Sequence, residues 1–550
     1  MSIVIGLDIG TSGIRAQAIE LDDKKVLSTA ITLRHPLPGS NVVDHLDFCI
    51  NNGIDVGHSI VVNAVENVLL NLNIDLKQVE RIAVCGNPIQ LSIFQGIEIR
   101  DLAYAGDAAL ERIGVSRLER RATVVDADKI GLSVVKPDVD VCIPPSVVHM
   151  IGADAIAMIV KSDMLNKREI AMVTDYGTNA EIGLMVGDEI YTGSAAAGPA
   201  IEGQQIEKGM LASPGVVSDI NLINGELQVT VLDDSMIGHA SYTLDAKSGS
   251  VIQKKENYIR PKGITGTGTI ALVYTSLQSG LVKLPNITTQ DKKLRLFYDE
   301  IFFTEKDLTE AGKAFGAFRA GHLTLVNHLG LTINDIKSAY MAGAGGTYVD
   351  PIKAQGVGLV PPNVKDIYQV GNTSLAFASD IAKDVSILDR AQEIAERLKH
   401  THVMFPVEKD FKNAYIVELG YWGGMPMDMY RKFLKKYNLP EYPERNIMPN
   451  VHRIVIRDIP VLGVKGLHIV RDIGTTMTQA FEGCTGCLSC ENACLEKALT
   501  VVNEDGKFRA VIRTELCDGV SCRKCEAACS NGVYDYSKMQ VRKRSSKQST

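Results

Sequence analysis

This chain of 550 residues has no long uninterrupted apolar run, no basic leader and only one tryptophan. The longest apolar candidate, residues 147–160, is interrupted by His149 and Asp154, so we expect no transmembrane helix. The first apolar stretch contains Asp8 and follows no basic region, which argues against a signal peptide. The net charge of -7 is modest and indicates neither nucleic-acid binding nor disorder. We therefore expect a soluble, cytoplasmic protein of about three to four domains.

Two common nucleotide-binding signatures are also missing. The sequence contains no G-x-x-x-x-G-K-[ST] motif, which disfavours a P-loop NTPase. It contains no G-x-G-x-x-G motif and no N-terminal βαβ unit. The glycine-rich residues 342–346, which follow an expected strand, therefore do not predict a Rossmann domain.

Cysteine is concentrated near the C-terminus, where eight of the 11 cysteines lie between residues 484 and 529. The first four follow C-x2-C-x2-C-x3-C, the two-cluster ferredoxin spacing in which the fourth thiolate binds the other cluster. The last four repeat this pattern with a longer first gap, as C-x4-C-x2-C-x3-C. The spacing predicts one [4Fe–4S] cluster on Cys484, Cys487, Cys490 and Cys529, and another on Cys517, Cys522, Cys525 and Cys494.

Structural zinc is the alternative for these cysteines, since four thiolates also suit a zinc ion. The proline that usually follows each fourth cysteine is replaced by Leu495 and Ser530. Two interlocked sets of four nevertheless favour iron–sulfur clusters over zinc. Such clusters, together with three scattered cysteines that we expect to be buried and inert, indicate a reducing compartment.

A second pattern occurs twice in matching strand contexts. Residues 3–8 form an apolar run that ends at Asp8 and is followed by a glycine turn; residues 169–175 do the same and end at Asp175. Apolar alternation after each turn predicts further antiparallel strands. Glycine lets backbone N–H groups approach phosphate oxygens, hydroxyl groups add donors, and the two aspartates can hold Mg²⁺. The repeat indicates two related lobes that handle phosphate and metal.

Three further segments are candidates for the same site. Gly266 and Gly268 lie at the expected N-terminus of a helix over residues 269–281, where anions bind readily. The small-residue stretch 193–199 is flat enough to lie against a ligand. Asp154 opens a small-residue helix, where a catalytic role and simple stabilisation by the helix dipole are equally favoured.

We call residues 8–12 and 175–179 the first and second Asp-Gly turns. The sequence resembles the acetate and sugar kinase/Hsc70/actin (ASKHA) superfamily in the order of its motifs: the two Asp-Gly turns, then GSAAAGP at 193–199, GITGTGT at 263–269 and AGAGG at 342–346. Within it, the chain is similar to the ATP-dependent reductive activators of corrinoid proteins. The cysteine module makes it most similar to the reductive activases of methylamine methyltransferase corrinoid proteins. Many such activators also carry an N-terminal [2Fe–2S] domain, whose spacing this sequence lacks, so electron delivery is assigned to the C-terminal clusters.

The resemblance implies an α/β fold: a two-lobed, RNase H-like/actin-like ATPase followed by a small α+β two-cluster ferredoxin domain. The implied domains are a first lobe at 1–165, a second lobe at 166–412, a connecting region of unknown role at 413–475, a ferredoxin domain at 476–538 and a basic, disordered tail at 539–550.

The resemblance also implies ATP and Mg²⁺ bound between the lobes. Its catalytic carboxylates would be Asp8, Asp175 and Asp154, the last as a base that activates the attacking hydroxyl or water. The implied nucleotide contacts are Gly10, Thr11, Ser12, Gly177, Thr178, Asn179, Gly266, Gly268, Gly343, Gly345 and Gly346.

The implied activity is ATP-dependent reduction of an inactive Co(II) corrinoid methyltransferase protein to Co(I) in methanogenesis from methylamines. Electrons would come from an upstream low-potential donor, with no nucleic-acid or membrane partner. Three alternatives stay open: an ATP-gated activator of another low-potential reductase, a small-molecule kinase fused to a ferredoxin, and an electron carrier with a non-hydrolysing nucleotide domain.

Overall fold

The computed structural model describes residues 2–104, 107–148, 151–177, 179–195, 205–455, 457–504 and 506–541. Within these ranges no helix is both long enough and apolar enough to cross a membrane. The chain forms two compact units, each built from segments far apart in sequence. The first unit consists of Met1–Asp154, Ser374–Ala395 and Val461–Thr550, and the second of Ala155–Thr373 and Glu396–Pro460.

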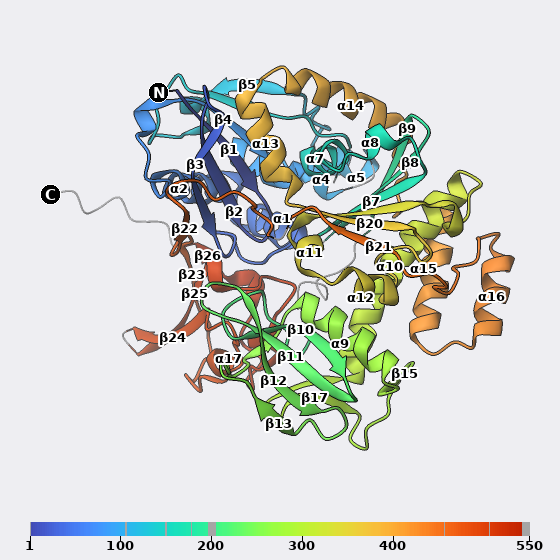
Figure 1. The fold of residues 1–550 in the computed structure, drawn as a ribbon. Helices are drawn as coiled ribbons and strands as arrows, with labels where there is room; N and C mark the ends of the chain where they lie inside the picture. Colours follow the sequence, from blue (N-terminus) through green and yellow to red (C-terminus); the bar gives the residue numbers. More distant parts are fainter. Residues whose placement is uncertain are drawn as a thin grey trace. The chain divides into compact units, whose positions relative to one another are not determined.

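The first unit is organised around a seven-stranded sheet with the order β22-β3-β2-β1-β4-β6-β5 (Figure 1). Its strands are β1 (Ile3–Ile9), β2 (Ile14–Glu20), β3 (Lys25–Thr32), β4 (Val79–Cys85), β5 (Thr123–Asp126), β6 (Asp140–Ile143) and β22 (Leu467–Val470). The first three form the predicted antiparallel meander. β4 then pairs parallel with β1, and β6 pairs parallel with β4. Every residue of β1 is buried, as its apolar sequence predicts.

Helix α13 (Thr373–Lys383) approaches this sheet closely because β1 contains Gly6. A Cβ atom at Gly6 would lie 2.4 Å from the Ser379 hydroxyl and 2.7 Å from its backbone nitrogen. Other helices of this unit include α1 (Val42–Asn52), α2 (Ile54–Leu70), α3 (Pro88–Gln95), α4 (Arg100–Ala103), α5 (Asp107–Arg112) and α6 (Ala127–Ile130). The segment 461–550 thus joins a unit whose sheet begins at residue 3.

The second unit repeats the same arrangement of antiparallel and parallel strands in a six-stranded sheet with the order β21-β20-β19-β7-β8-β9. Its strands are β7 (Ala171–Tyr176), β8 (Ala180–Val186), β9 (Glu189–Ala195), β19 (Ser338–Ala342), β20 (Asp366–Gly371) and β21 (Asn450–Arg453). β7 to β9 are an antiparallel meander, and β19 and β20 are added in parallel beside β7. The correspondence with β1–β4 and β6 supports the two related folds that the paired turns predict.

A smaller sheet and several helices complete the second unit. The five-stranded sheet comprises β10 (Val216–Ile223), β11 (Glu226–Leu232), β12 (Gly238–Asp245), β13 (Val251–Lys254) and β14 (Gly263–Ile264). Two separate two-stranded hairpins pair β15 (Val282–Lys283) with β16 (Asn286–Ile287) and β17 (Lys293–Phe297) with β18 (Ile301–Thr304). The helices include α8 (Met164–Lys167), α9 (Gly266–Gln278), α10 (Glu305–His328), α11 (Gly343–Tyr348) and α12 (Pro351–Val357).

Two helices of the second unit, α15 (Lys409–Trp422) and α16 (Met427–Lys436), include the first part of the region 413–475, for which the sequence predicts no role. α15 packs along α10 through a buried ion pair, in which Arg319 Nε lies 2.5 Å from Glu418 Oε2. The Tyr430 hydroxyl of α16 donates to the other Glu418 oxygen at 2.6 Å. Trp422 is buried against Phe315, as expected for a core aromatic.

Replacing Glu418 by glutamine is expected to lower the free energy of unfolding of the second unit by about 3–5 kcal/mol, because Arg319 would be left buried without its counter-charge. Tryptophan fluorescence during denaturation measures this unit, since Trp422 is the only tryptophan in the chain. Glu310→Gln is the matched control: its partner Lys313 lies at 2.8 Å but is 49% exposed, and surface pairs contribute about 0–1 kcal/mol. Equal losses in the two variants would contradict the prediction.

The cysteine-rich module lies within the first unit and has its own four-stranded sheet, ordered β24-β25-β23-β26. Its elements are β23 (Thr476–Ala480), α17 (Ser489–Asn492), β24 (Leu499–Glu504), β25 (Lys507–Arg513), α18 (Lys524–Ala527) and β26 (Gln540–Val541). Each short helix contains the third cysteine of one motif. The lobe and domain boundaries implied by the family resemblance stay predictions.

Candidate functional site

The first Asp-Gly turn lies between β1 and β2. Asp8 is only 4% exposed, and the antiparallel register places it directly opposite Arg15. The Arg15 guanidinium lies 3.3 Å from Asp8 Oδ2. The Gly10 N–H donates to the Gly13 carbonyl at 3.0 Å and closes the turn that contains the predicted phosphate-binding residues Thr11 and Ser12. This geometry fixes the Asp8 carboxylate at the end of a buried strand.

Asp154, in the first turn of α7 (Ala153–Lys161), lies near Cys85, as Asp8 does. Cys85 pairs with Asp8 across β1 and β4. Burial raises the pKa of the Cys85 thiol, and the charges of Asp8 and Asp154 raise it further. The structure thus places two of the predicted carboxylates around one thiol. Sequence patterns miss Arg15 and Cys85, although the hairpin register would have paired Arg15 with Asp8.

The second Asp-Gly turn meets the glycine-rich segment 342–346 at the ends of two parallel strands. Asp175, the last residue but one of β7, pairs with Ala342 of β19. Gly343, with a φ of +78°, approaches so closely that a Cβ atom there would lie 2.3 Å from Asp175 Oδ1. A Cβ at Gly345 would lie 2.3 Å from the Tyr176 carbonyl. Two segments about 170 residues apart in sequence, both predicted to contact nucleotide, are therefore adjacent.

The other residues of the second unit that are predicted to contact nucleotide differ in what the structure shows of them. Gly177 and Asn179 flank Thr178, which lies outside the described residues, as do residues 196–199 of the small-residue stretch. Gly268 is buried in α9, where a Cβ would lie 2.5 Å from the Val217 carbonyl. Packing of α9 on β10 therefore accounts for Gly268 without a ligand. Gly266 is also buried there, and a nucleoside contact for either glycine stays a prediction.

Replacing Gly343 by alanine is expected to weaken Mg²⁺–ATP binding at least about tenfold, equivalent to ~1.4 kcal/mol, because the new methyl group would displace Asp175. Gly330→Ala is the matched control in the same unit. Gly330 has a φ of +66°, but nothing lies within 4 Å of the position that a Cβ atom would take there, so the two substitutions share the backbone cost and differ in the clash. Titration with a fluorescent ATP analogue measures both affinities, and equal affinities would contradict the role of the Gly343–Asp175 contact.

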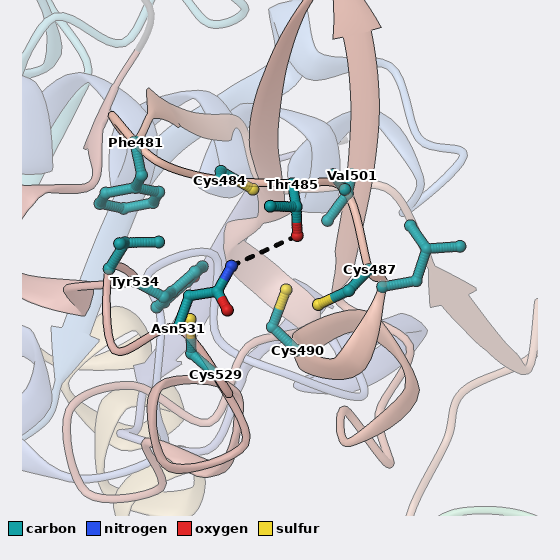
Figure 2. Close-up of a pocket in the computed structure, with 12 residues that line it drawn as sticks. Phe481, Cys484, Thr485, Cys487, Cys490, Val501, Cys529, Asn531 and Tyr534 are labelled. Atoms are coloured by element: carbon teal, nitrogen blue, oxygen red, sulfur yellow. Dashed lines mark hydrogen bonds between the residues drawn. The ribbon is translucent and has the colours of Figure 1, made fainter.

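Four thiols line one hollow of the cysteine-rich module. They come from Cys484, Cys487 and Cys490 of the first motif and from Cys529 of the second. Figure 2 shows these side chains around the hollow, with the Asn531 amide donating to the Thr485 hydroxyl at 3.3 Å. Phe481, Val501 and Tyr534 supply an apolar wall. The fourth cysteine of the second motif thus lies with the first three of the first motif, which is the interlocked arrangement that ferredoxin spacing predicts.

The other four thiols are those of Cys494, Cys517, Cys522 and Cys525, and Cys525 lies near each of the other three. Burial raises the pKa of the Cys525 thiol, and the proximity of Cys494 raises it further. Burial also raises the pKa of Cys522 to about 11, and Cys525 contributes to that rise. Cys517 is affected in the same way by burial and by Cys525. Ligation requires thiolates, so metal binding at such buried thiols has to displace protons.

Among the described residues, no three Cys, His, Asp or Glu side chains converge closely enough to hold a single metal ion. The first set instead lines a hollow, and its soft sulfur donors suit iron–sulfur clusters or zinc.

The two cysteine motifs are built as a structural repeat, offset by 35 residues at their last three cysteines. Leu488 and Arg523 occupy equivalent positions and both have positive φ, at 62° and 43°. The carboxylate that follows each third cysteine accepts a backbone N–H ten residues later: Glu491 from Val501 at 2.7 Å, and Glu526 from Tyr536 at 3.3 Å. Duplicated local geometry of this kind supports two equivalent ligand loops.

Comparison with known proteins agrees with this architecture. The family model of the RACo middle region matches residues 3–167, and the model of the C-terminal domain of RACo, the ASKHA domain, matches residues 169–431. A solved structure titled a reductive activator for corrinoid, iron-sulfur protein has a TM-score of 0.61 and 22% identity, covering 76% of this chain and 66% of that one. At this identity, the match shows that the two proteins share a fold.

Two curated relatives extend the comparison. A [Co(II) methylated amine-specific corrinoid protein] reductase of Methanosarcina barkeri is 44% identical over 523 residues, covering 94% of this chain and 95% of the relative. The corrinoid activation enzyme RamQ of Eubacterium limosum is 22% identical over 391 residues, covering 65% and 60%.

Fold and turns together define the class: a protein with an ASKHA-type α/β fold, here with a C-terminal cysteine-rich module. The 44% identity to the Methanosarcina barkeri reductase, over 94% of this chain and 95% of that protein, defines the family as well. The chain belongs to the RACo-type reductive activators of corrinoid proteins, together with the methylated amine-specific corrinoid protein reductase.

Proposed function

We propose that this protein uses ATP to reduce methylated amine-specific corrinoid proteins from inactive Co(II) to Co(I), in methanogenesis from methylamines. The observation that carries the proposal is the 44% identity, over 95% of its length, to a reductase named for that substrate. The paired Asp-Gly turns and the eight-cysteine module in one polypeptide support it, because the first suits phosphate and Mg²⁺ and the second suits electron carriers.

The chain's own residues have separable tasks in this proposal. Asp8 and Asp175 hold Mg²⁺, directly or through its waters, and Arg15 orients the Asp8 carboxylate. The backbone N–H groups of the two turns receive phosphate oxygens. Gly343 keeps the space beside Asp175 free of a side chain. Asp154 serves either as a base for the attacking water or as an N-terminal charge on α7.

The cysteines would hold two [4Fe–4S] clusters, one on Cys484, Cys487, Cys490 and Cys529 and one on Cys517, Cys522, Cys525 and Cys494. Bound there, the clusters supply one-electron carriers whose potentials span roughly −700 to +450 mV, depending on their surroundings. An upstream low-potential donor is then required as the source of electrons.

ATP is required if the donor potential lies above that of the cobalt. Each ~59 mV of shortfall lowers the one-electron equilibrium constant tenfold. Nucleotide offsets such a gap only if it binds two conformations of the complex with different affinity. In this proposal, a nucleotide-driven change of conformation in this protein remodels the bound corrinoid protein and makes its cobalt easier to reduce.

The test uses the full chain, reconstituted anaerobically with iron and sulfide and mixed with a methylamine corrinoid protein in the Co(II) state and a low-potential reductant. The Co(I) absorbance is expected to appear with Mg²⁺–ATP, and to be nearly absent when ATP is omitted or replaced by a non-hydrolysable analogue. Equal Co(I) formation without ATP would overturn the coupling. Transfer of phosphate to a sugar or carboxylic acid in place of Co(I) formation would favour the kinase alternative.

A further inference from the structure

The second set of cysteines is tied to the nucleotide-handling part of the first unit by a continuous series of contacts. The series begins at the first Asp-Gly turn. The Ile14 N–H, just after that turn, donates to the Thr32 hydroxyl at 2.8 Å. A Cβ at Gly13 would lie 2.9 Å from the Thr32 carbonyl, so the turn and the end of β3 are in direct contact. A displacement of the turn therefore reaches Thr32.

The next contacts lead from Thr32 to the cysteine-rich module. The Thr32 hydroxyl donates to the Arg34 carbonyl at 2.7 Å. The Arg34 guanidinium is ion-paired with Glu496 and lies 3.5 Å from the Asp518 carboxylate. It also donates to the Leu516 carbonyl at 3.4 Å.

The partners of Arg34 flank one set of cysteines only. Glu496 lies two residues after Cys494, and Leu516 and Asp518 lie on either side of Cys517. Both cysteines belong to the predicted second cluster. The sulfurs of these two residues accept N–H groups from Ala498 at 3.3 Å and from Gly519 at 3.4 Å. Charge and hydrogen bonds near the sulfurs are the features by which a protein sets a cluster's potential.

A second group of contacts holds the same cysteine loop. The Gly39 N–H donates to the Cys517 carbonyl at 2.7 Å. Asp44 accepts both the backbone N–H of Ser521, at 3.0 Å, and its hydroxyl, at 2.9 Å. A Cβ at Gly519 would lie 2.6 Å from the Asp44 carboxyl carbon. The loop is therefore clamped against residues 34–44 at several points.

This clamp explains the irregular spacing of the second motif. The gap between Cys517 and Cys522 has two more residues than the corresponding gap between Cys484 and Cys487. The longer gap contains Asp518, Gly519 and Ser521, all of which contact residues 34–44. By contrast, Cys487 of the first motif is exposed, and its sulfur contacts Ser489 within the module at 3.4 Å.

We propose that Arg34 is a positioning residue that couples the nucleotide state of the first Asp-Gly turn to the second cluster, held by Cys494, Cys517, Cys522 and Cys525. Movement of the turn on nucleotide binding shifts Thr32 and Arg34, and with them the charges and hydrogen bonds around Cys494 and Cys517. The potential of this cluster changes with nucleotide, and that of the first cluster does not. The inference rests on the proposed function in that it assumes nucleotide at this turn.

The test is a redox titration of the reconstituted full chain, followed by electron paramagnetic resonance, with and without Mg²⁺ and the ATP analogue AMP-PNP. The second cluster is recognised as the signal lost in Cys517→Ala. In the wild-type protein, the nucleotide is expected to shift the midpoint of that cluster alone. Arg34→Met is expected to displace its resting midpoint and to abolish the shift, while leaving the other cluster unchanged.

Two variants keep this test decisive. Arg34→Lys retains the charge but not the forked geometry that reaches two carboxylates and a carbonyl, so the resting midpoint should stay near the wild-type value while the nucleotide shift is reduced. If Arg34→Met fails to retain iron, the Arg34→Lys variant alone tests the proposal. Arg509→Met is the control, because Arg509 pairs with Glu504 inside the module, at 2.9 Å, and should leave the shift intact.

A full nucleotide shift in both Arg34 variants, equal displacement of both midpoints, or no nucleotide shift in the wild-type protein would each overturn the coupling. The titration contains no corrinoid protein, so its result is independent of the partner. A normal, Arg34-dependent shift combined with no Co(I) formation would contradict the proposed substrate and leave the coupling standing.

Discussion

The double substitution Cys484→Ala/Cys529→Ala is expected to halve the iron of the reconstituted protein, from about eight atoms to about four. Both thiols line the same hollow, so removing both destroys one cluster and spares the other. Cys484→Ala/Cys494→Ala should instead remove ligands from both clusters and leave almost no iron. Chemical iron analysis and electron paramagnetic resonance measure the two outcomes.

This pair of variants also discriminates between the possible ligand sets. If each motif held its own metal site in sequence order, the results would be reversed: Cys484→Ala/Cys494→Ala would retain half of the metal, and Cys484→Ala/Cys529→Ala would lose nearly all. Cys142→Ala, at a buried thiol in β6, is the control and should keep the full complement. Zinc in place of iron in the wild-type protein would contradict the cluster assignment altogether.

Replacing Asp175 by asparagine is expected to lower ATP-dependent Co(I) formation and ATP hydrolysis by about 100-fold or more, the size of effect seen when one preorganised electrostatic group is removed. Asp8→Asn should act similarly, because the proposed function assigns Mg²⁺–ATP binding to the first Asp-Gly turn as well. Iron content should be unchanged in both variants. Asp299→Asn alters an exposed aspartate of the second unit that pairs with Arg295, and serves as the control. Retention of ATP hydrolysis in both Asp8→Asn and Asp175→Asn would contradict the assignment of the two turns.

Asp154→Asn separates the two roles left open for that residue. A base that activates water would show a loss of hydrolysis comparable to that of Asp175→Asn, with unchanged ATP affinity. A charge that only stabilises the N-terminus of α7 would cost about 0.3–1 kcal/mol of stability and leave hydrolysis nearly intact. Hydrolysis rates and denaturation midpoints of the same preparation distinguish these outcomes.

Local patterns in the sequence predict local structure well in this protein. Alternating apolar residues on either side of a glycine turn predict both meanders, and the structure has them as β1–β3 and β7–β9. Cysteine spacing predicts that Cys529 lies with the first motif, because the geometry of a cluster constrains which thiols can meet.

Contacts between distant segments have no such signature. The parallel partners of β1 and β7, the strands β4 and β19, lie many residues away and pair through backbone groups that any sequence possesses. The mixed segment 98–148 supplies β5 and β6, which its pattern does not reveal. The Arg34 contacts with Glu496 and Asp518 join positions more than 450 residues apart, and nothing in the sequence around Arg34 distinguishes it from an arginine exposed to solvent.

The pairing of β22 with β3 has a practical consequence for dissecting this protein. β22 is supplied by Leu467–Val470 and occupies the outer position of the sheet that begins at the N-terminus. A polypeptide cut after Pro460 to remove the cysteine-rich module would leave the N–H and C=O groups of β3 open to strand addition, and we expect it to self-associate. Ending the chain at Gly474 would keep that border covered while still deleting every cysteine of the module.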